Sequence, residues 1–410
     1  MIDAKHFRTI IIGAGPAGLF AHASLNAGTS LLLEKKNLPG RKLMISGTGQ
    51  CNFTHAGSMD DFKNHYGKNA RFLNKAFDTF SNEDAVDFFR NRKINSKTDE
   101  NGKVFPSSMK AGDILQALLD ASTHPQKKLL TSMQVMAIQK TENIFIIKTS
   151  DFIYTSDFLI VATGGKSYPT TGSTGDGYTF ASSLGHTIVE PNPALTAVTI
   201  SDYPFMKLAG VSFVDAEISQ WRNGSKLISV KGDLLLTHTG LSGPVILNNS
   251  RFFRAGDKLV INFCNSNEKE FEDLFIYQAS HAGKSTIGTF MRNTIMPKNL
   301  VTSILQTTNL NASKPLAEIS KTARKQLINL SCAFPFTIEA VGGFKSAMVT
   351  SGGVALEEIN ALTMESTIVP RLYFCGEVID IDGDTGGYNI QAAFSTAYLA
   401  ARDINKKATG

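Results

Sequence analysis

The chain has 410 residues, enough for two or three domains with well-buried cores. Its 42% of hydrophobic and 19% of charged residues are typical of a folded globular protein and exclude a disordered chain. The net charge of +5 is too small to require an anionic partner, and no apolar run approaches the roughly 20 residues of a membrane span, so we expect a cytoplasmic protein.

The chain begins with the pattern of a strand, a helix and a second strand. An apolar run over 9–12 stops abruptly at Gly13, as buried parallel strands do. A helical pattern covers 15–26, and a second apolar run covers 30–34. This βαβ unit predicts an α/β fold with a doubly wound, Rossmann-like sheet.

A G-x-G-x-x-G motif joins that first strand to the helix. Gly13 permits the tight turn, Gly15 lets the backbone approach a pyrophosphate, and Gly18 lets helix and strand pack closely. The helix N-terminus offers free N–H groups and a positive dipole end to the phosphates. Glu34 stands 21 residues after Gly13, where an acid binds ribose hydroxyls. The predicted dinucleotide site comprises Gly13, Ala14, Gly15, Pro16, Ala17, Gly18 and Glu34.

Helices and a β-meander continue this first domain. Two helices are predicted over 68–92, the second beginning at Ser81 with a capping-box acid at Asp84. Three apolar runs between 131 and 162 predict a β-meander, which ends in a loop that begins Ala162-Thr163-Gly164.

The pattern changes near residue 191. Alternating runs around 197, 211 and 234 predict antiparallel strands, and the stretch from about 267 to 330 is mostly helical. A strand, a glycine-rich loop and a helix then close the chain. We therefore expect a dinucleotide-binding domain made of residues 1–190 and 343–410, interrupted by an inserted β-rich domain with a helical subregion over 191–342.

The C-terminal unit distinguishes FAD from NAD. Its strand ends at Cys375, and the segment 376–388 leads into the last helix. In two-dinucleotide folds this helix faces the pyrimidine side of a flavin, where its dipole stabilises negative charge on the reduced ring. No second G-x-G-x-x-G with strand and acid is present. We therefore expect FAD as the cofactor and NADH or NADPH as a reductant that binds transiently.

The positive charge is concentrated in one segment. Between 283 and 330 there are seven basic residues and a single acid, Glu318, a net charge of +6. Such a surface suits the phosphates of RNA, although a solvated helical face has the same composition. The basic residues are Lys284, Arg292, Lys298, Lys314, Lys321, Arg324 and Lys325.

The four cysteines are far apart in the sequence and form no C-x-x-C pair. This spacing argues against a disulfide framework and against zinc, and we expect no metal. They are Cys51, Cys264, Cys332 and Cys375.

Three further blocks become recognisable together with the N-terminal motif. Residues 40–54 are GRKLMISGTGQCNFT, residues 237–244 are THTGLSGP, and the C-terminal unit runs from 376 to 391. Over essentially the whole chain these blocks resemble the BaiN/YhiN-type family of bacterial FAD-dependent oxidoreductases. The resemblance implies an FAD fold of the two-dinucleotide type with an inserted domain.

The resemblance also implies further cofactor contacts. Glu34 and Lys35 would hold the adenosine ribose region, and the Val135 backbone would hold the adenine. The contacts to the pyrophosphate and flavin would come from Arg41, Lys42, Ser46, Gly47 and Asn52, with Ala162, Thr163 and Gly164 nearby. The ribityl chain and ring would be surrounded by Gly376, Glu377, Asp380, Gly387, Tyr388 and Asn389.

Several reactions are compatible with such a site. Activities in the family imply reduction of a uridine in ribosomal RNA, reduction of conjugated C=C bonds in steroids, or oxidation of a small amine with O₂. We expect reduction of an activated C=C bond, with a base in ribosomal RNA preferred over a small enone. A reductase needs a proton donor beside the flavin, for which Cys51 in the flavin block and His238 in the inserted domain are the candidates.

Overall fold

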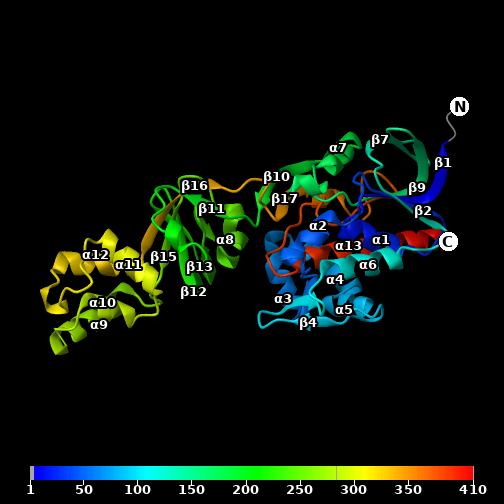
Figure 1. Cartoon of the computed structure of the whole chain (residues 1–410). Helices are drawn as coiled ribbons and strands as arrows, with labels where there is room; N and C mark the ends of the chain where they lie inside the picture. The colour runs from blue at the N-terminus through cyan, green and yellow to red at the C-terminus, as the bar shows by residue number, and fades with distance from the viewer. Residues whose placement is uncertain (1–3, 283, 410) are drawn as a thin grey trace. The chain divides into compact units, whose positions relative to one another are not determined.

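The computed structural model describes residues 4–282 and 284–409. Its chain divides into two compact units, Met1–Ala194 with Phe344–Gly410, and Leu195–Gly343 (Figure 1). Each unit has its own hydrophobic core. The division lies within four residues of the boundaries expected from the sequence, and we treat the units separately as unit 1 and unit 2.

Unit 1 is built on a seven-stranded sheet of order β6-β2-β1-β9-β8-β7, with β18 also paired to β9. The strands β6, β2, β1, β9 and β18 run parallel, and β7 and β8 complete an antiparallel meander with β9. The first half of β9 pairs with β8 and its second half with β18, so the sheet forks there. The bounds are β1 Lys5–Ile12, β2 Ser30–Leu33, β6 Lys127–Leu130, β7 Val135–Lys140, β8 Phe145–Thr149, β9 Ile153–Val161 and β18 Leu372–Phe374.

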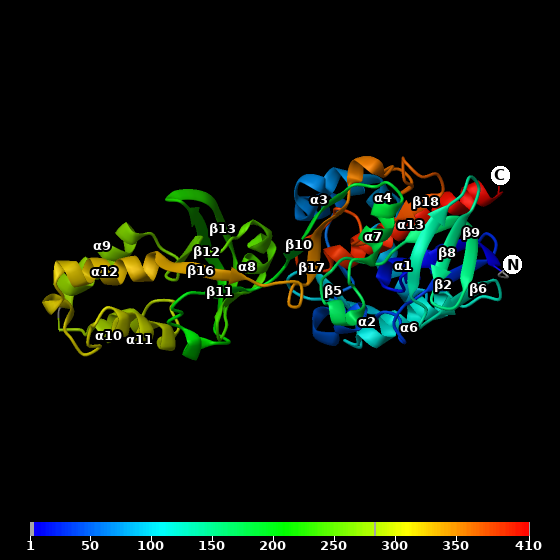
Figure 2. The ribbon, with the colours of Figure 1, turned by 90° about the horizontal axis from the view of Figure 1, so that it is seen from above.

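Helices from both ends of the chain meet in this unit. α1 (Pro16–Ser24) packs against α13 (Tyr388–Thr409) and α6 (Ala111–Ala121), as Figure 2 shows for the first and last helices. Phe20 on α1 contacts the rings of Phe80, Phe88 and Phe394 and is fully buried, which contributes roughly 2–3 kcal/mol. The other helices are α2 Arg41–Ile45, α3 Met59–Lys63, α4 Asn74–Thr79, α5 Asn82–Arg90 and α7 Asp176–Ser183.

Several local predictions are confirmed. The βαβ opening and the meander are present, and β18 and α13 form the C-terminal strand and helix. The capping box at Ser81 is complete, because its hydroxyl accepts from the Asp84 N–H while the Asp84 carboxylate accepts from the Ser81 N–H. Two small sheets complete unit 1: β3 (Thr54–His55), β5 (Lys103–Pro106) and β4 (Ser96–Thr98), and the antiparallel pair β10 (Ile188–Ala194) and β17 (Val349–Val354).

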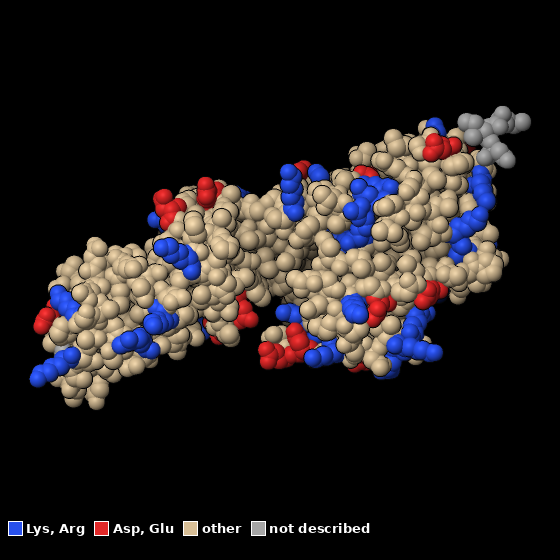
Figure 3. Space-filling model, viewed as in Figure 1, with Lys and Arg blue, Asp and Glu red and all other residues tan. Residues whose placement is uncertain are grey.

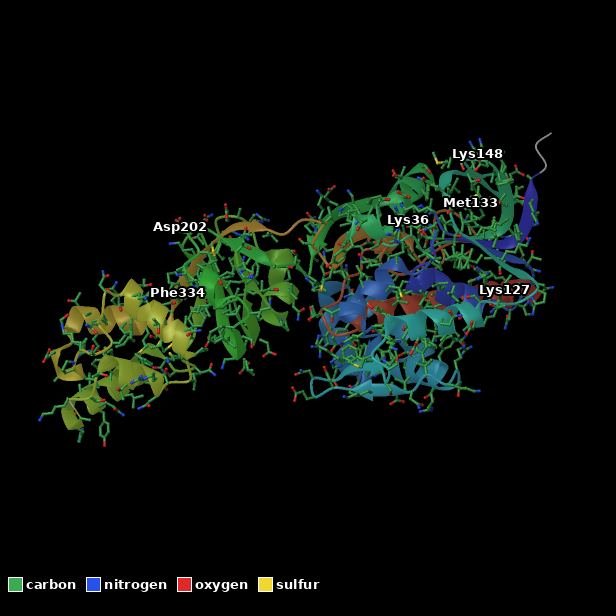
Figure 4. The ribbon with its side chains drawn as sticks, viewed as in Figure 1. Lys36, Lys127, Met133, Lys148, Asp202 and Phe334 are labelled. Atoms are coloured by element: carbon green, nitrogen blue, oxygen red, sulfur yellow. The ribbon has the colours of Figure 1, made fainter. Side chains whose placement is uncertain are left out.

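Over the described residues, unit 2 is a closed six-stranded barrel, and five α-helices lie between the last three of its strands in sequence. Aromatic rings fill the barrel core, among them Phe205, Phe263, Phe336 and Phe334, the last of which is labelled in Figure 4. The barrel consists of β11 Val198–Ile200, β14 Gly240–Ser242, β13 Ser225–Leu236, β12 Ser212–Arg222, β15 Lys258–Asn262 and β16 Phe334–Val341. The helices are α8 Pro244–Asn249, α9 Glu268–His281, α10 Ile287–Arg292, α11 Lys298–Thr307 and α12 Lys321–Cys332.

The buried imidazole of His22 on α1 makes the stability of unit 1 depend on pH. Burial, assisted by the nearby charge of Lys127, lowers the pKa of His22 from 6.5 to about 4. Since the unfolded chain then binds the proton more tightly, stability falls as the pH drops from about 6.5 through 4, by about 3 kcal/mol. Denaturant unfolding of His22→Gln at several pH values should lack this loss. The exposed His124→Gln control should keep it, and equal slopes for all three proteins would contradict the assignment.

Candidate functional site

The glycine motif folds as a close contact between β1, β9 and α1. Gly13 has a φ of 99°, and a Cβ there would lie 2.6 Å from the carbonyl oxygen of Ala162. A Cβ on Gly18 would overlap the carbonyl oxygen of Gly13. Both positions therefore require glycine for the tight turn and for helix–strand packing, which is the geometry predicted from the motif.

Gly15 is different, because a Cβ there would meet no atom within 4 Å. Gly15 is the N-cap of α1, and no side chain caps the helix. The N-terminus of α1 is therefore uncapped and has open space beside Gly15, which suits the approach of a phosphate. This open space at the N-terminus of α1 is the observation that fits the binding of the FAD pyrophosphate at Gly15.

Glu34 is fixed at the end of β2, beside this turn. Its carboxylate accepts from the Ala14 N–H at 2.9 Å and from the Lys36 N–H at 2.8 Å. The Met133 N–H binds the Glu34 carbonyl at 2.8 Å, and Figure 4 labels Lys36 and Met133 in this region. Val135, two residues further, is buried at the start of β7. The acid is therefore oriented toward the turn, as a ribose-binding carboxylate must be.

Lys35 has a different set of contacts. Its ammonium forms an ion pair with Asp176 at 2.6 Å and also binds the hydroxyl of Thr174. Asp176 is the first residue of α7, and Thr174 lies two residues before it. The Lys35 side chain therefore connects the segment after β2 to the N-terminal end of α7.

An ion pair joins the predicted flavin block to the C-terminal unit. Lys42 on α2 contacts the Glu377 carboxylate at 2.8 Å, and Glu377 also accepts from the Thr350 N–H at 2.9 Å. The Thr350 hydroxyl accepts in turn from the N–H groups of Lys166 and Ser167. Four segments far apart in sequence meet here. Thr350 belongs to no recognised motif, so its part in this network was not predictable from the sequence.

Two buried oxygens near the flavin block have no hydrogen-bond partner among the described residues. They are Oδ1 of Asn52 and Oγ1 of Thr163. A Cβ on Gly387 would lie 2.8 Å from that Asn52 oxygen, so the block and the C-terminal loop are adjacent. Buried polar atoms without a protein partner are costly, so these two fit a site that takes a polar ligand. Nearby, Gly47 has a φ of 53°, Arg41 is exposed, and Ser46 donates to the Leu43 carbonyl.

The C-terminal loop is held by side chains from α13 and from Asn69. Asn389 binds both backbone groups of Gly383, and the amide of Asn69 donates to the carbonyl and carboxylate of Asp380. The Gly376 N–H donates to the Thr396 hydroxyl at 3.0 Å. Gly164 has a φ of 71° in the loop after β9. These bonds hold the loop rigid next to the start of α13.

An aromatic cluster surrounds Tyr388, and sequence reasoning missed most of it. The Tyr388 ring is stacked on His65 at 4.0 Å and on His55 at 4.9 Å. His65 also lies 3.1 Å from the Asp384 carboxylate, and the Tyr66 hydroxyl donates to the Tyr388 carbonyl. Burial raises the pKa of Tyr388 to about 12, so the phenol stays neutral. Tyr388 therefore acts as a packing surface in this loop.

The two candidate proton donors have opposite environments. Cys51 is fully buried, and burial raises the pKa of its thiol to about 12. A donor works best when its pKa lies near the working pH, so the burial of Cys51 weighs against its assignment. His238 is exposed in the loop between β13 and β14 of unit 2. The loop is fixed by the Thr237 N–H bonding to the Gly240 carbonyl at 2.9 Å.

The open space at Gly15 generates a prediction. In Gly15→Ala the fold should persist, but the added methyl group should block the phosphate and weaken FAD binding by about tenfold or more. The flavin-to-protein ratio after purification and titration of the apoprotein with FAD measure this. Gly112→Ala in α6 is the matched control. If Gly15→Ala bound FAD with unchanged affinity, the phosphates of FAD would have to bind elsewhere in the protein.

The sequence and the fold both match known proteins. The family model described as HI0933-like protein Rossmann domain matches residues 7–403. The chain is 30% identical to the 3-dehydro-bile acid delta(4,6)-reductase of Clostridium scindens, covering 96% of this chain and 97% of that protein. It is 31% identical to the ribosomal RNA dihydrouridine synthase of Haemophilus influenzae, covering 98% and 100%, and 30% identical to the Escherichia coli protein of that name, covering 98% of each chain.

A solved structure shares the fold. The 3-ketosteroid-delta4-(5alpha)-dehydrogenase of Rhodococcus jostii aligns over 100% of this chain and 98% of its own, with a TM-score of 0.52 and 12% identity. This similarity extends only to the fold. With a family match over nearly the whole chain and a Rossmann-type FAD-binding unit, this protein belongs to the HI0933-like family of FAD-dependent oxidoreductases.

Proposed function

We propose that the protein reduces the C5=C6 bond of a uridine in ribosomal RNA, with FAD as cofactor and NADH or NADPH as electron donor. The observation that carries the reaction class is the agreement among full-length relatives. A dihydrouridine synthase and a bile-acid delta(4,6)-reductase both saturate a C=C bond, and each is at least 30% identical to this chain over nearly its whole length. The shared chemistry therefore supports C=C reduction.

Within unit 1 the residues have distinct tasks toward FAD. The α1 N-terminus at Gly15 would hold the pyrophosphate, Glu34 the ribose, and Asn52 and Thr163 would give their unpaired oxygens to polar groups of the cofactor. Bound FAD supplies a hydride at its ring. The Lys42–Glu377 pair fixes the loops around it, so that a flat base can be positioned without rearrangement of the site.

The choice of RNA is supported by where the charge lies. Unit 2 has fifteen Lys and Arg residues against eleven Asp and Glu, a net charge of +4 out of the chain's +5. Six of the seven basic residues between 283 and 330 are exposed, and Figure 3 shows blue side chains on the helical part of unit 2. The seventh, Arg324, pairs with Glu272 of α9 at 3.1 Å. Phosphate backbones bind to such surfaces with a strong salt dependence.

A small enone is the second candidate substrate. The 30% identical bile-acid reductase supports it. So does α2, which exposes the apolar side chains of Met44 and Ile45 beside Lys42. An apolar substrate would lie on such residues, and it would not need the basic surface of unit 2.

Stopped-flow reoxidation of the photoreduced enzyme tests the proposal. The reduced enzyme is mixed without oxygen with ribosomal RNA from a strain deleted for the gene. It is mixed in parallel with a 3-keto-delta-4 steroid, or with air-saturated buffer. We expect rapid reoxidation by RNA and dihydrouridine in the RNA by mass spectrometry. If only the steroid reoxidised the flavin, the substrate would be a small enone and not RNA. If only oxygen reoxidised it, the protein would be an oxidase.

A charge variant checks the RNA surface separately. Lys321→Glu with Lys325→Glu should slow reoxidation by RNA about tenfold or more at low salt and lower the salt dependence. The control is Lys93→Glu with Lys97→Glu, exposed lysines of unit 1. If the two double variants were reoxidised by RNA at the same rate, the basic segment would not be part of the RNA-binding surface.

The two candidate donors are separated by single substitutions. His238→Ala should lower the rate of substrate-dependent flavin reoxidation by about 100-fold, because removing a general acid typically costs the chemical step about that factor. Cys51→Ala should leave that rate within about threefold, because its buried thiol holds its proton too tightly. Substrate affinity is measured in parallel. The reverse pattern would restore Cys51 as the donor.

A further inference from the structure

Two cysteines of unit 2 that are 68 residues apart in sequence lie in contact. Cys264 follows β15 by two residues, and Cys332 is the last residue of α12, two residues before β16 begins. β15 pairs antiparallel with β16 with Ile261 opposite Phe334. The Phe263 N–H continues this pairing with a 3.0 Å bond to the Ser331 carbonyl. The strand register therefore brings the two Sγ atoms to 2.9 Å from each other, with both thiols free.

The surroundings of the two thiols are unequal. The Ser266 hydroxyl donates to Cys264 Sγ at 3.5 Å, and the Cys264 N–H is held by the Asn262 side chain at 3.1 Å. The contact with Cys332 lowers the pKa of Cys264, while the same contact raises the pKa of Cys332. One sulfur is therefore suited to attack as a thiolate and the other keeps its proton. This division is what a nucleophilic and a resolving cysteine require.

The contact is not part of the flavin site. Both cysteines belong to the hydrophobic core of unit 2, and the residues that fit FAD all lie in unit 1. Two thiols within contact distance, one with an added hydroxyl donor, indicate a chemical role.

We propose that Cys264 and Cys332 form a redox-active dithiol that small-molecule disulfides convert into an intramolecular disulfide. The Cys264 thiolate attacks one sulfur of the disulfide, which forms a mixed disulfide and releases the first small thiolate. Cys332 then gives up its proton, and its thiolate attacks Cys264 Sγ and releases the second. The two protein thiols lose two electrons in total, and the small disulfide is reduced to two thiols.

This disulfide would cross-link the two ends of the helical subregion next to the barrel strands. The chain between the two cysteines contains α9, α10, α11 and most of α12, and the bond would close it into a loop anchored at β15 and β16. Closing a loop of this length restricts the unfolded chain, so the oxidised protein should melt several degrees higher than the reduced protein.

The test uses the full-length, FAD-loaded protein with oxidised glutathione as the probe. We expect an intact mass lower by two hydrogens, a fall from four titratable thiols in the denatured protein to two, and a cross-linked Cys264–Cys332 peptide. Cys332→Ser should instead retain one glutathione on Cys264, because the resolving thiol is missing. Cys375→Ser, which removes a fully buried thiol of unit 1, should still form the disulfide.

Several outcomes would overturn the proposal. The proposal is wrong if the folded protein still has four free thiols after oxidation, or if the disulfide forms only in denaturant. It is also wrong if wild-type Cys264 retains a bound glutathione. An unchanged melting temperature in oxidised protein that carries the mapped cross-link would overturn the anchoring role. None of these readouts depends on the substrate, so the dithiol and the reductase proposals fail independently.

Discussion

The contact between α1 and the ends of β1 and β9 is the constraint on which unit 1 depends. The backbone of Gly18 lies against the carbonyl of Gly13, and Gly13 itself lies against Ala162. No side chain fits between these segments, so the helix starts directly at the edge of the sheet and its first N–H groups remain free. The same close packing that stabilises the fold therefore creates the phosphate cradle at Gly15. Structure and cofactor binding have one physical origin here.

The return of the chain from unit 2 completes that site. β17 and β18 bring Thr350 and Glu377 to Lys42, and the loop before α13 reaches Asn52. None of these contacts is local in sequence. The C-terminal segment is part of the site because it supplies the Glu377 carboxylate to Lys42 and the Gly387 backbone next to Asn52. Unit 1 is therefore built from two separate stretches of the chain.

Unit 2 has a separate core, most of the net charge and the dithiol. Its β15–β16 pairing has two consequences at once. It closes the barrel, and it places Cys264 beside Cys332 at the point where the helical subregion begins and ends. The basic residues of 283–330 and the Cys264–Cys332 contact thus belong to the same subregion of the chain.

Local patterns by themselves determined the βαβ opening, the capping box at Ser81 and the dinucleotide motif. Each depends on residues close in sequence, whose steric and hydrogen-bonding preferences are fixed by residue type. The sequence also indicated a discontinuous domain, because the C-terminal strand and helix repeat the N-terminal pattern. The resemblance to a flavoprotein family added the blocks around Lys42 and Glu377.

Only the tertiary structure decided the remaining features. It paired the Lys35 ammonium with Asp176, buried Cys51, and stacked His65 and His55 on Tyr388. It also brought together two cysteines that are unrelated by sequence spacing. Burial, pKa and contact between distant residues depend on how strands and helices pack in space, and residue type alone does not specify that packing.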